Sequence, residues 1–239
     1  MRPNPLLAAH GLCLLVMLAM LGMPLALHAQ TSNTTPAAAP AAPAAPAAPA
    51  TPAALATGGV EVSGVRYAPT VPVGGSTLTL NGAGTRFKFV VRVYTAGLYL
   101  GAKAATPDAV YTAPGPKRMH VVMLRDIDAN ELGKLFTRGM QDNTPREAFS
   151  KYIAGTLRMA EIFSAKKKLL AGDNFSIDYV PGVGTTVLVN GKAQGEAVRE
   201  QEFFNALMSI WLGPNPADDG LKAALLGQEA TAPRGGRNR

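Results

Sequence analysis

The chain has 239 residues, of which 47% are hydrophobic, and its formal net charge is +7 at pH 7. This length and hydrophobic fraction are sufficient for one globular domain with its own core. About +4 of the charge belongs to residues 58–228, and a charge this modest does not indicate a nucleic-acid-binding protein. The single cysteine, Cys13, lies in an apolar run near the amino terminus. If that run is removed, the mature chain has no disulfide, catalytic thiol or thiolate metal site.

Residues 1–29 predict a signal peptide. Arg2 provides the positive charge at the start, residues 11–27 are almost all apolar, and Ala29 ends a small-residue cleavage site before Gln30. The alternative is an uncleaved membrane anchor, and we expect membrane association only in that case. The apolar run is short for a spanning helix, which needs about 20 apolar residues. We therefore expect a periplasmic or secreted protein.

Three further segments follow the signal peptide. Residues 30–57 are an Ala/Pro-rich linker in which proline recurs near every third position. This pattern favours an extended polyproline II spacer over a packed core. Residues 58–228 have the mixed composition of a folded domain, and residues 229–239 are a Gly/Arg-rich basic tail that we predict to be disordered.

The folded domain begins with patterns typical of strands. Residues 60–67 and 76–80 are β-rich, and residues 81–84, Asn-Gly-Ala-Gly, predict a turn because glycine permits positive φ. A second strand is predicted over 87–94, and it ends in Gly-Leu-Tyr-Leu at 97–100. The glycines do not form a nucleotide-binding loop, because the third glycine and the Gly-Lys-Ser/Thr element are missing and a strand follows instead of a helix.

The rest of the domain alternates between helices and strands. A short helix is predicted from Thr106 and a strand over 118–124, and two helices start at the capping boxes of Asp128 and Thr144. Strands are predicted over 174–180 and 185–189, followed by a hairpin turn at Asn190-Gly191. The domain ends with a helix from near Val198, with Trp211 on its apolar side, and a short helix over 218–226. Such separate runs of strands and helices indicate an α+β fold, with helices covering one face of an antiparallel sheet.

Three segments carry a family resemblance. Gly82-Ala83-Gly84-Thr85-Arg86 and Gly97-Leu98-Tyr99-Leu100 look like the Gly-Ala-Gly-x-Arg and Gly-Val/Leu-Tyr-Leu signature of the chalcone isomerase-like family. The ending Ile210-Trp211-Leu212-Gly213 is similar to the close of its bacterial, exported branch. The resemblance covers residues 60–227. It implies a chalcone isomerase-like antiparallel β-sheet covered on one face by a layer of helices, with a ligand cleft between sheet and helices.

Few residues of the predicted mature chain can carry chemistry. His120 is its only histidine, so a Ser-His-Asp triad would have to use it, and a zinc site of the usual kind lacks ligands. We expect His120 to be structural or at the surface. Arg92 and Tyr94 should face one side of their strand and Thr95 the other. An arginine binds a carboxylate through two charge-assisted hydrogen bonds, and a neighbouring tyrosine hydroxyl can donate a third.

The resemblance implies two possible functions at these positions. Family members that isomerise chalcones use the arginine matched by Arg86, a threonine that falls on Tyr94 (with Thr95 one step along), and a tyrosine and an asparagine that fall near Leu132 and Gly139. Fatty-acid-binding members have arginine and tyrosine at the first two positions, as this chain has with Arg86 and Tyr94.

We therefore expect a non-catalytic exported protein that binds a fatty-acid-like amphipathic carboxylate. Arg86, Tyr94, Thr95 and, on the last long helix, Ser209 are the expected ligand-binding residues. One alternative is an intramolecular lyase of the chalcone isomerase type, acting on a phenolic ligand with Arg86 as its catalytic residue. Another is an envelope interaction module with a vestigial cleft. We expect no cofactor, no metal and no nucleic-acid partner.

Overall fold

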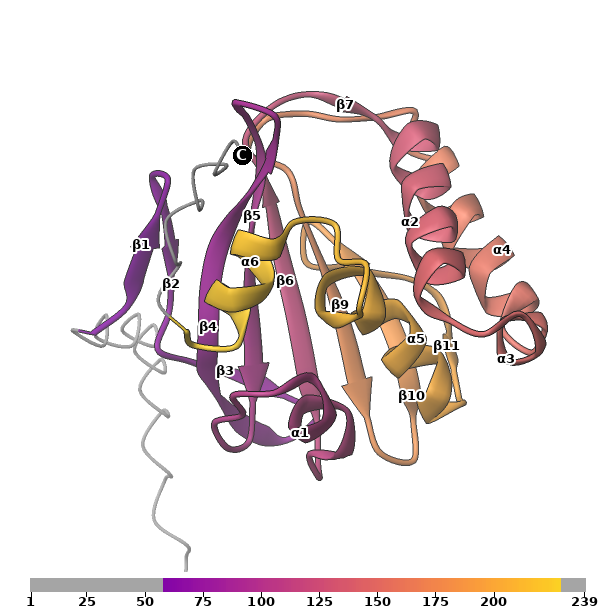
Figure 1. The fold of residues 1–239 in the computed structure, drawn as a ribbon, viewed down its shortest axis with the longest axis horizontal. Coiled ribbons are helices and arrows are strands. Elements are labelled where there is room, and N and C mark those ends of the chain that lie inside the picture. Colours follow the sequence, from indigo (N-terminus) through magenta and orange to yellow (C-terminus); the bar gives the residue numbers. More distant parts are fainter. Residues whose placement is uncertain (1–57, 229–239) are drawn as a thin grey trace, which may run out of the picture. The chain divides into compact units, whose positions relative to one another are not determined.

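The computed structural model describes residues 58–228 (Figure 1). The predicted signal peptide (1–29), the linker (30–57) and the basic tail (229–239) lie outside the described residues. Between residues 58 and 228, none of the helices is long and apolar enough to cross a membrane.

An antiparallel sheet of seven strands forms the centre of the fold, in the order β11-β10-β9-β6-β5-β4-β3. Its strands are β3 (Thr70–Val73), β4 (Ser76–Lys88), β5 (Val91–Leu100), β6 (Lys117–Met123), β9 (Asn174–Val180), β10 (Gly184–Val189) and β11 (Lys192–Val198). Two small pairs accompany it, β1 (Val60–Val62) with β2 (Val65–Tyr67) and β7 (Ile127–Asp128) with β8 (Lys168–Leu169). Strand β6 pairs with β9, so the helices between them form one insertion into an otherwise sequential sheet.

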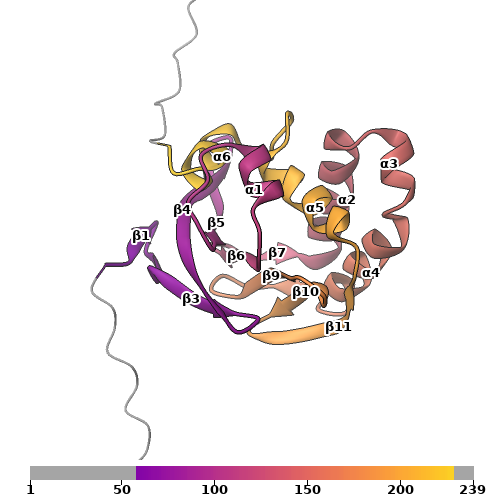
Figure 2. The same cartoon turned by 90° about the horizontal axis from the view of Figure 1, so that it is seen from below.

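The helices gather on one side of the sheet, which curls around them (Figure 2). They are α1 (Pro107–Thr112), α2 (Ala129–Asn143), α3 (Arg146–Ser150), α4 (Ile153–Ser164), α5 (Gln201–Leu212) and α6 (Asp219–Leu225). The α+β architecture expected from the sequence, an antiparallel sheet covered on one face by helices, is confirmed.

Alternation along β5 separates two hydrophobic clusters. Tyr94, Ala96 and Leu98 face the helices and belong to the main core, whereas Tyr99 faces the other side and joins a smaller cluster with Tyr67. Trp211 of α5 is fully buried in the main core, as its apolar helix face predicts. The sheet therefore presents one apolar face to the helices and a second face to the β1–β2 hairpin.

The predicted turn at residues 81–84 is wrong. Strand β4 continues through these residues with a register shift between Leu80 and Gly82. The chain reverses at Phe89-Val90 instead, so the strand predicted over 87–94 is also wrong. The glycines serve close packing. A Cβ added at Gly84 would lie 2.6 Å from Cβ of Ala224 on α6, and one at Gly82 would collide with the Ala224 carbonyl. Glycine at both positions lets α6 lie directly on β4.

Two other predicted elements differ from the structure. The strand over 60–67 is the β1–β2 hairpin, because Ser63 and Gly64 both take positive φ (49° and 84°). The helix predicted from Thr144 is divided into α3 and α4, and Thr144 ends α2 instead of capping the next helix. The break turns the ring of Tyr152 toward Phe203, with ring centres 6.4 Å apart. Asp128 caps α2 as predicted, since its side chain accepts from the Glu131 backbone N–H at 3.0 Å, whereas the Glu131 carboxylate pairs with Lys134 at 2.8 Å.

Candidate functional site

Arg86 and Tyr94 lie directly opposite each other on the paired strands β4 and β5. Arg86 follows Gly82 and Gly84 at alternate positions, so its side chain lies on the face that packs against α6. The Cζ atom of Arg86 is 5.5 Å from the centre of the Tyr94 ring, within the range of a cation–π contact. The fold thus brings together the two residues that the sequence places first in a ligand site.

The charge of Arg86 is only partly satisfied by the protein. Its Nε atom is buried without a hydrogen-bond partner. None of the ion pairs formed within residues 58–228 includes its guanidinium group. A buried donor without a partner is unfavourable, and more so when it carries charge. An anion placed against Nε would remove this cost.

Tyr94 offers a second donor beside Arg86. Its side chain is buried, and its hydroxyl oxygen accepts a hydrogen bond from Nε1 of Trp211 at 2.8 Å. The hydroxyl hydrogen remains available, because the indole N–H can only donate. Burial raises the pKa of Tyr94 to about 12, although Arg86 and the Trp211 hydrogen bond oppose this rise. Tyr94 therefore stays protonated at neutral pH and can donate to an anion.

A cavity of about 160 Å³ connects this pair to the helices. Its remaining walls come from α2 and from α5 with the loop that follows it: Leu132, Leu135, Phe136, Arg138, Gly139, Asp142, Ile210, Asn215, Pro216 and Ala217. Arg138 and Asp142 form an exposed pair with each other at 3.6 Å. Leu132 and Gly139 lie near the positions where the family resemblance places a tyrosine and an asparagine in isomerases. The cavity thus combines the side chains of Arg86 and Tyr94 with largely apolar walls.

The structure places the other two expected site residues elsewhere. Thr95 is fully buried on the opposite face of the sheet, where its Oγ1 accepts from the hydroxyl of Tyr67 at 2.8 Å. Ser209 donates to the carbonyl of Ala206 at 2.7 Å and lines a different cavity. Neither residue joins the cavity of Arg86 and Tyr94, and their part in ligand binding stays a prediction. Trp211 is the residue that sequence reasoning missed, since its position indicated only a core role.

The cavity beside Ser209 is larger, about 490 Å³, and lies against α1 and α5. The hydroxyl of Tyr111 and Oδ1 of Asn205 line it, and both are buried without a hydrogen-bond partner. Its only lining cation, Lys222, already donates to the carbonyl of Gly213 at 2.7 Å. Lys222 thus has a hydrogen-bond partner in the protein, whereas the buried Nε of Arg86 has none, so we place the candidate site at Arg86.

His120 lies on the face of the sheet that points away from the helices. Its Nδ1 is 2.8 Å from the hydroxyl of Ser176, and burial together with nearby Arg118 lowers the pKa of His120, against the opposing effect of Asp178. Across residues 58–228, no group of three or more histidine, cysteine or acidic side chains is arranged to hold a metal ion.

The buried Tyr94 hydroxyl should make stability depend on alkaline pH. Because its pKa is raised from 10 to about 12 by folding, stability from this group is complete below pH 10 and is lost as pH rises through the folded value. We expect Tyr94→Phe to reduce the fall in the free energy of unfolding between about pH 9 and pH 12 by roughly 2–3 kcal/mol. Urea unfolding at several pH values measures this slope.

The matched control for the alkaline slope is Tyr152→Phe, which removes a partly exposed hydroxyl. The pH dependence of the free energy of unfolding of this variant should stay closer to that of the unmodified protein, because Tyr94 is retained and the other buried tyrosines still titrate. Equal slopes in the two variants would contradict the buried, proton-retaining state of Tyr94.

Comparisons with known proteins agree with this architecture. A family model described as chalcone isomerase-like matches residues 59–227. No curated protein matches the chain. Among solved structures, a fatty-acid binding protein of Arabidopsis thaliana is similar, with a TM-score of 0.56 and 14% sequence identity over 68% of this chain and 92% of that one. At this identity the likeness shows a shared fold.

Proposed function

Because the chain belongs to the chalcone isomerase-like family, we propose that it is a non-catalytic binding protein for an amphipathic carboxylate of the fatty-acid kind. The observation that carries this proposal is the buried, partnerless Nε of Arg86 beside the free hydroxyl hydrogen of Tyr94. Both donors line one cavity whose other walls are mostly apolar. A carboxylate head with a hydrocarbon tail matches that arrangement.

The two donors suit a carboxylate because they are held in place before the ligand arrives. The guanidinium of Arg86 lies over the Tyr94 ring, and Trp211 fixes the position of the Tyr94 oxygen. Charge-assisted hydrogen bonds of this kind are roughly twice as strong as neutral ones. A site formed in advance also loses less side-chain freedom on binding.

The size of the cavity limits how much of the ligand it encloses. Its volume of about 160 Å³ is below the range of about 300–1,000 Å³ that is usual for sites enclosing a whole drug-sized ligand. In our proposal the cavity holds the carboxylate and the first methylene groups. The rest of the chain leaves past Leu135, an apolar side chain of α2 that is 39% exposed.

The tyrosine and asparagine that the family resemblance assigns to isomerases near Leu132 and Gly139 are replaced in this cavity. Leu132 and Gly139 supply no hydroxyl or amide. A general acid or base works best with a pKa near the operating pH, and the pKa of Tyr94 is about 12. The similar Arabidopsis protein is a fatty-acid binding protein, which supports the binding proposal rather than the lyase alternative.

We also propose that the protein is exported and acts in the periplasm or outside the cell, on the basis of the signal pattern in residues 1–29. One measurement tests both proposals, mass spectrometry of the intact protein purified from a bacterium. The denatured protein should have the mass of a chain starting at or near Gln30, and the native protein should carry an added mass that fragments as a fatty acid. A mass that begins at Met1 would contradict export, and fatty acid loading that persists in Arg86→Ala would contradict the ligand site.

A further inference from the structure

The turn between β4 and β5 exposes an unusual group of large apolar side chains. Phe89 is 93% exposed and Val90 is 91% exposed, and Phe87 and Val91 beside them are 45% and 40% exposed. We call residues 87–91 the hairpin tip, and it lies at the upper end of the sheet in Figure 1. Single exposed apolar residues are ordinary, but a contiguous group of them marks an interaction surface.

The backbone of the hairpin tip is strained to hold Phe89 there. Phe89 has a φ of 58°, a conformation that a bulky residue rarely adopts. Two-residue hairpin turns with positive φ favour glycine or asparagine at such positions. The β10–β11 turn of this protein follows that rule with Asn190 and Gly191, at φ values of 49° and 75°. A strained aromatic residue where glycine would fit without strain points to selection for function.

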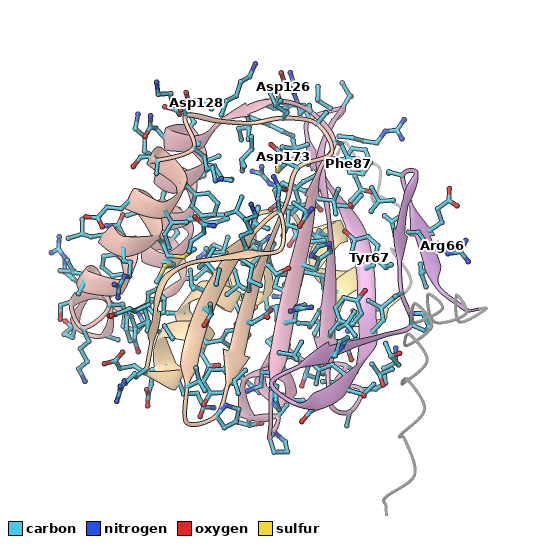
Figure 3. All side chains as sticks on the ribbon, turned by 180° about the vertical axis from the view of Figure 1, so that it is seen from behind. Arg66, Tyr67, Phe87, Asp126, Asp128 and Asp173 are labelled. Carbon is cyan, nitrogen blue, oxygen red and sulfur yellow. The ribbon has the colours of Figure 1, made fainter. Side chains whose placement is uncertain are left out.

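Positive side chains lie within the hairpin and in two segments at the same end of the molecule. Lys88 and Arg92 are exposed within the hairpin itself. A neighbouring loop joins it at Leu124, whose N–H donates to the carbonyl of Val93 at 3.0 Å. This loop (124–126) and the segment 166–173, which are joined through the pairing of β7 with β8, carry further exposed cations and the 51% exposed Leu170. Figure 3 shows Phe87 at the same end of the molecule as Asp126 and Asp173 of these segments. The exposed cations there are Arg125, Lys166, Lys167 and Lys168.

Acidic side chains offset part of this positive charge, since Asp218 accepts from the Phe87 N–H at 2.8 Å and Asp128 is exposed next to Ala129, whose N–H donates to the Lys167 carbonyl. Asp126 pairs with Lys168 at 2.8 Å, and the side chain of Asp173 accepts from Leu170 N–H and from Asn190. The other five cations form no ion pair among residues 58–228; they are Lys88, Arg92, Arg125, Lys166 and Lys167. This end of the molecule therefore combines protruding apolar side chains with unpaired positive charge.

We propose that this end docks on an anionic lipid bilayer, with Phe89 and Val90 inserted among the lipids. A stable protein interface buries about 1,200–2,000 Å² with close shape complementarity, which a narrow turn cannot provide. A bilayer accepts protruding apolar side chains without a shaped partner, and its anionic headgroups attract the surrounding cations. The inference rests neither on the predicted signal peptide nor on the proposed carboxylate ligand.

Site-specific labelling tests the proposal on the full chain. In a Cys13→Ser background, an environment-sensitive fluorophore is attached to Val90→Cys or, as the matched control, to Val183→Cys in the β9–β10 turn, where Val183 is 53% exposed. With vesicles of equimolar phosphatidylcholine and phosphatidylglycerol, the label at position 90 should shift to the emission of an apolar environment and the label at 183 should not. With phosphatidylcholine alone the shift at 90 should be much smaller. No shift at 90, or equal shifts at both positions, would overturn the proposal.

Two further variants, read through the label at position 90, separate insertion from general effects on the fold. Phe89→Gly should raise the melting temperature, because it relieves the positive φ, and should lower vesicle partitioning by about 10-fold or more. A structural role for Phe89 predicts the opposite change in melting temperature. Lys88→Gln with Arg92→Gln should lower partitioning about 5-fold per charge at low salt. Unchanged partitioning in both variants would refute docking through the hairpin tip.

Discussion

Arg86→Ala should weaken binding of a fatty acid by about 10- to 150-fold while the domain stays folded. This range corresponds to the roughly 1.5–3 kcal/mol of a hydrogen bond to a charged group. The physical reason is that the buried Nε of Arg86 has no partner in the protein, so the ligand carboxylate supplies its hydrogen bond. Arg86→Lys should recover only part of the affinity, because an ammonium keeps the charge and loses the planar fork.

Calorimetric titration with octanoate, which stays monomeric in buffer, measures this loss. Arg92→Ala is the matched control, because Arg92 is an exposed arginine of the adjacent strand that does not line the cavity. Tyr94→Phe should cost about 1 kcal/mol, the value of one neutral hydrogen bond, or about 5-fold in affinity. Equal affinities for the unmodified protein and Arg86→Ala, together with chalcone turnover above the spontaneous rate, would favour the lyase alternative.

The sequence predicted the fold well where local signals and burial agree. Asp128 caps α2 and Asn190-Gly191 forms a hairpin turn because both signals are local and need no distant partner. The turn predicted at the glycines of β4 was wrong because these glycines are needed for the close packing of α6. That helix lies more than a hundred residues further along the chain. A glycine required by a tertiary contact has the same sequence signature as a glycine required by a turn.

For the candidate site, the sequence predicted the pair of Arg86 and Tyr94 but did not predict the hydrogen bond from Trp211 to Tyr94. Arg86 and Tyr94 could be named from motif and strand alternation, and the strand register places them opposite each other. Thr95 follows Tyr94 by one residue, and the period of a strand sends it to the other face. The hydrogen bond from Trp211 to Tyr94 joins positions 117 residues apart. No periodicity or spacing contains that information.

Trp211→Ala should be the most destabilising single change, with a loss of about 3–5 kcal/mol in the free energy of unfolding, as for other buried aromatic residues cut to alanine. Trp211 is fully buried, and its ring lies edge-on to Phe136 with centres 5.6 Å apart. The change also leaves the Tyr94 oxygen without its donor. Because domains of this size have a total stability of about 5–15 kcal/mol, the loss is a large fraction of the whole.

Urea unfolding of the alanine variant beside Trp211→Phe separates the two contributions. The phenylalanine variant keeps most of the ring volume and loses the N–H, so its loss should be about 1–3 kcal/mol, the cost of a buried group without its partner. Leu157→Ala, at a side chain that is 60% exposed, should stay within about 0.5 kcal/mol of the unmodified protein. A loss under about 1 kcal/mol for Trp211→Ala would place Trp211 outside the core. If Trp211→Phe also weakens octanoate binding while Leu157→Ala does not, the indole N–H holds Tyr94 in position for the ligand.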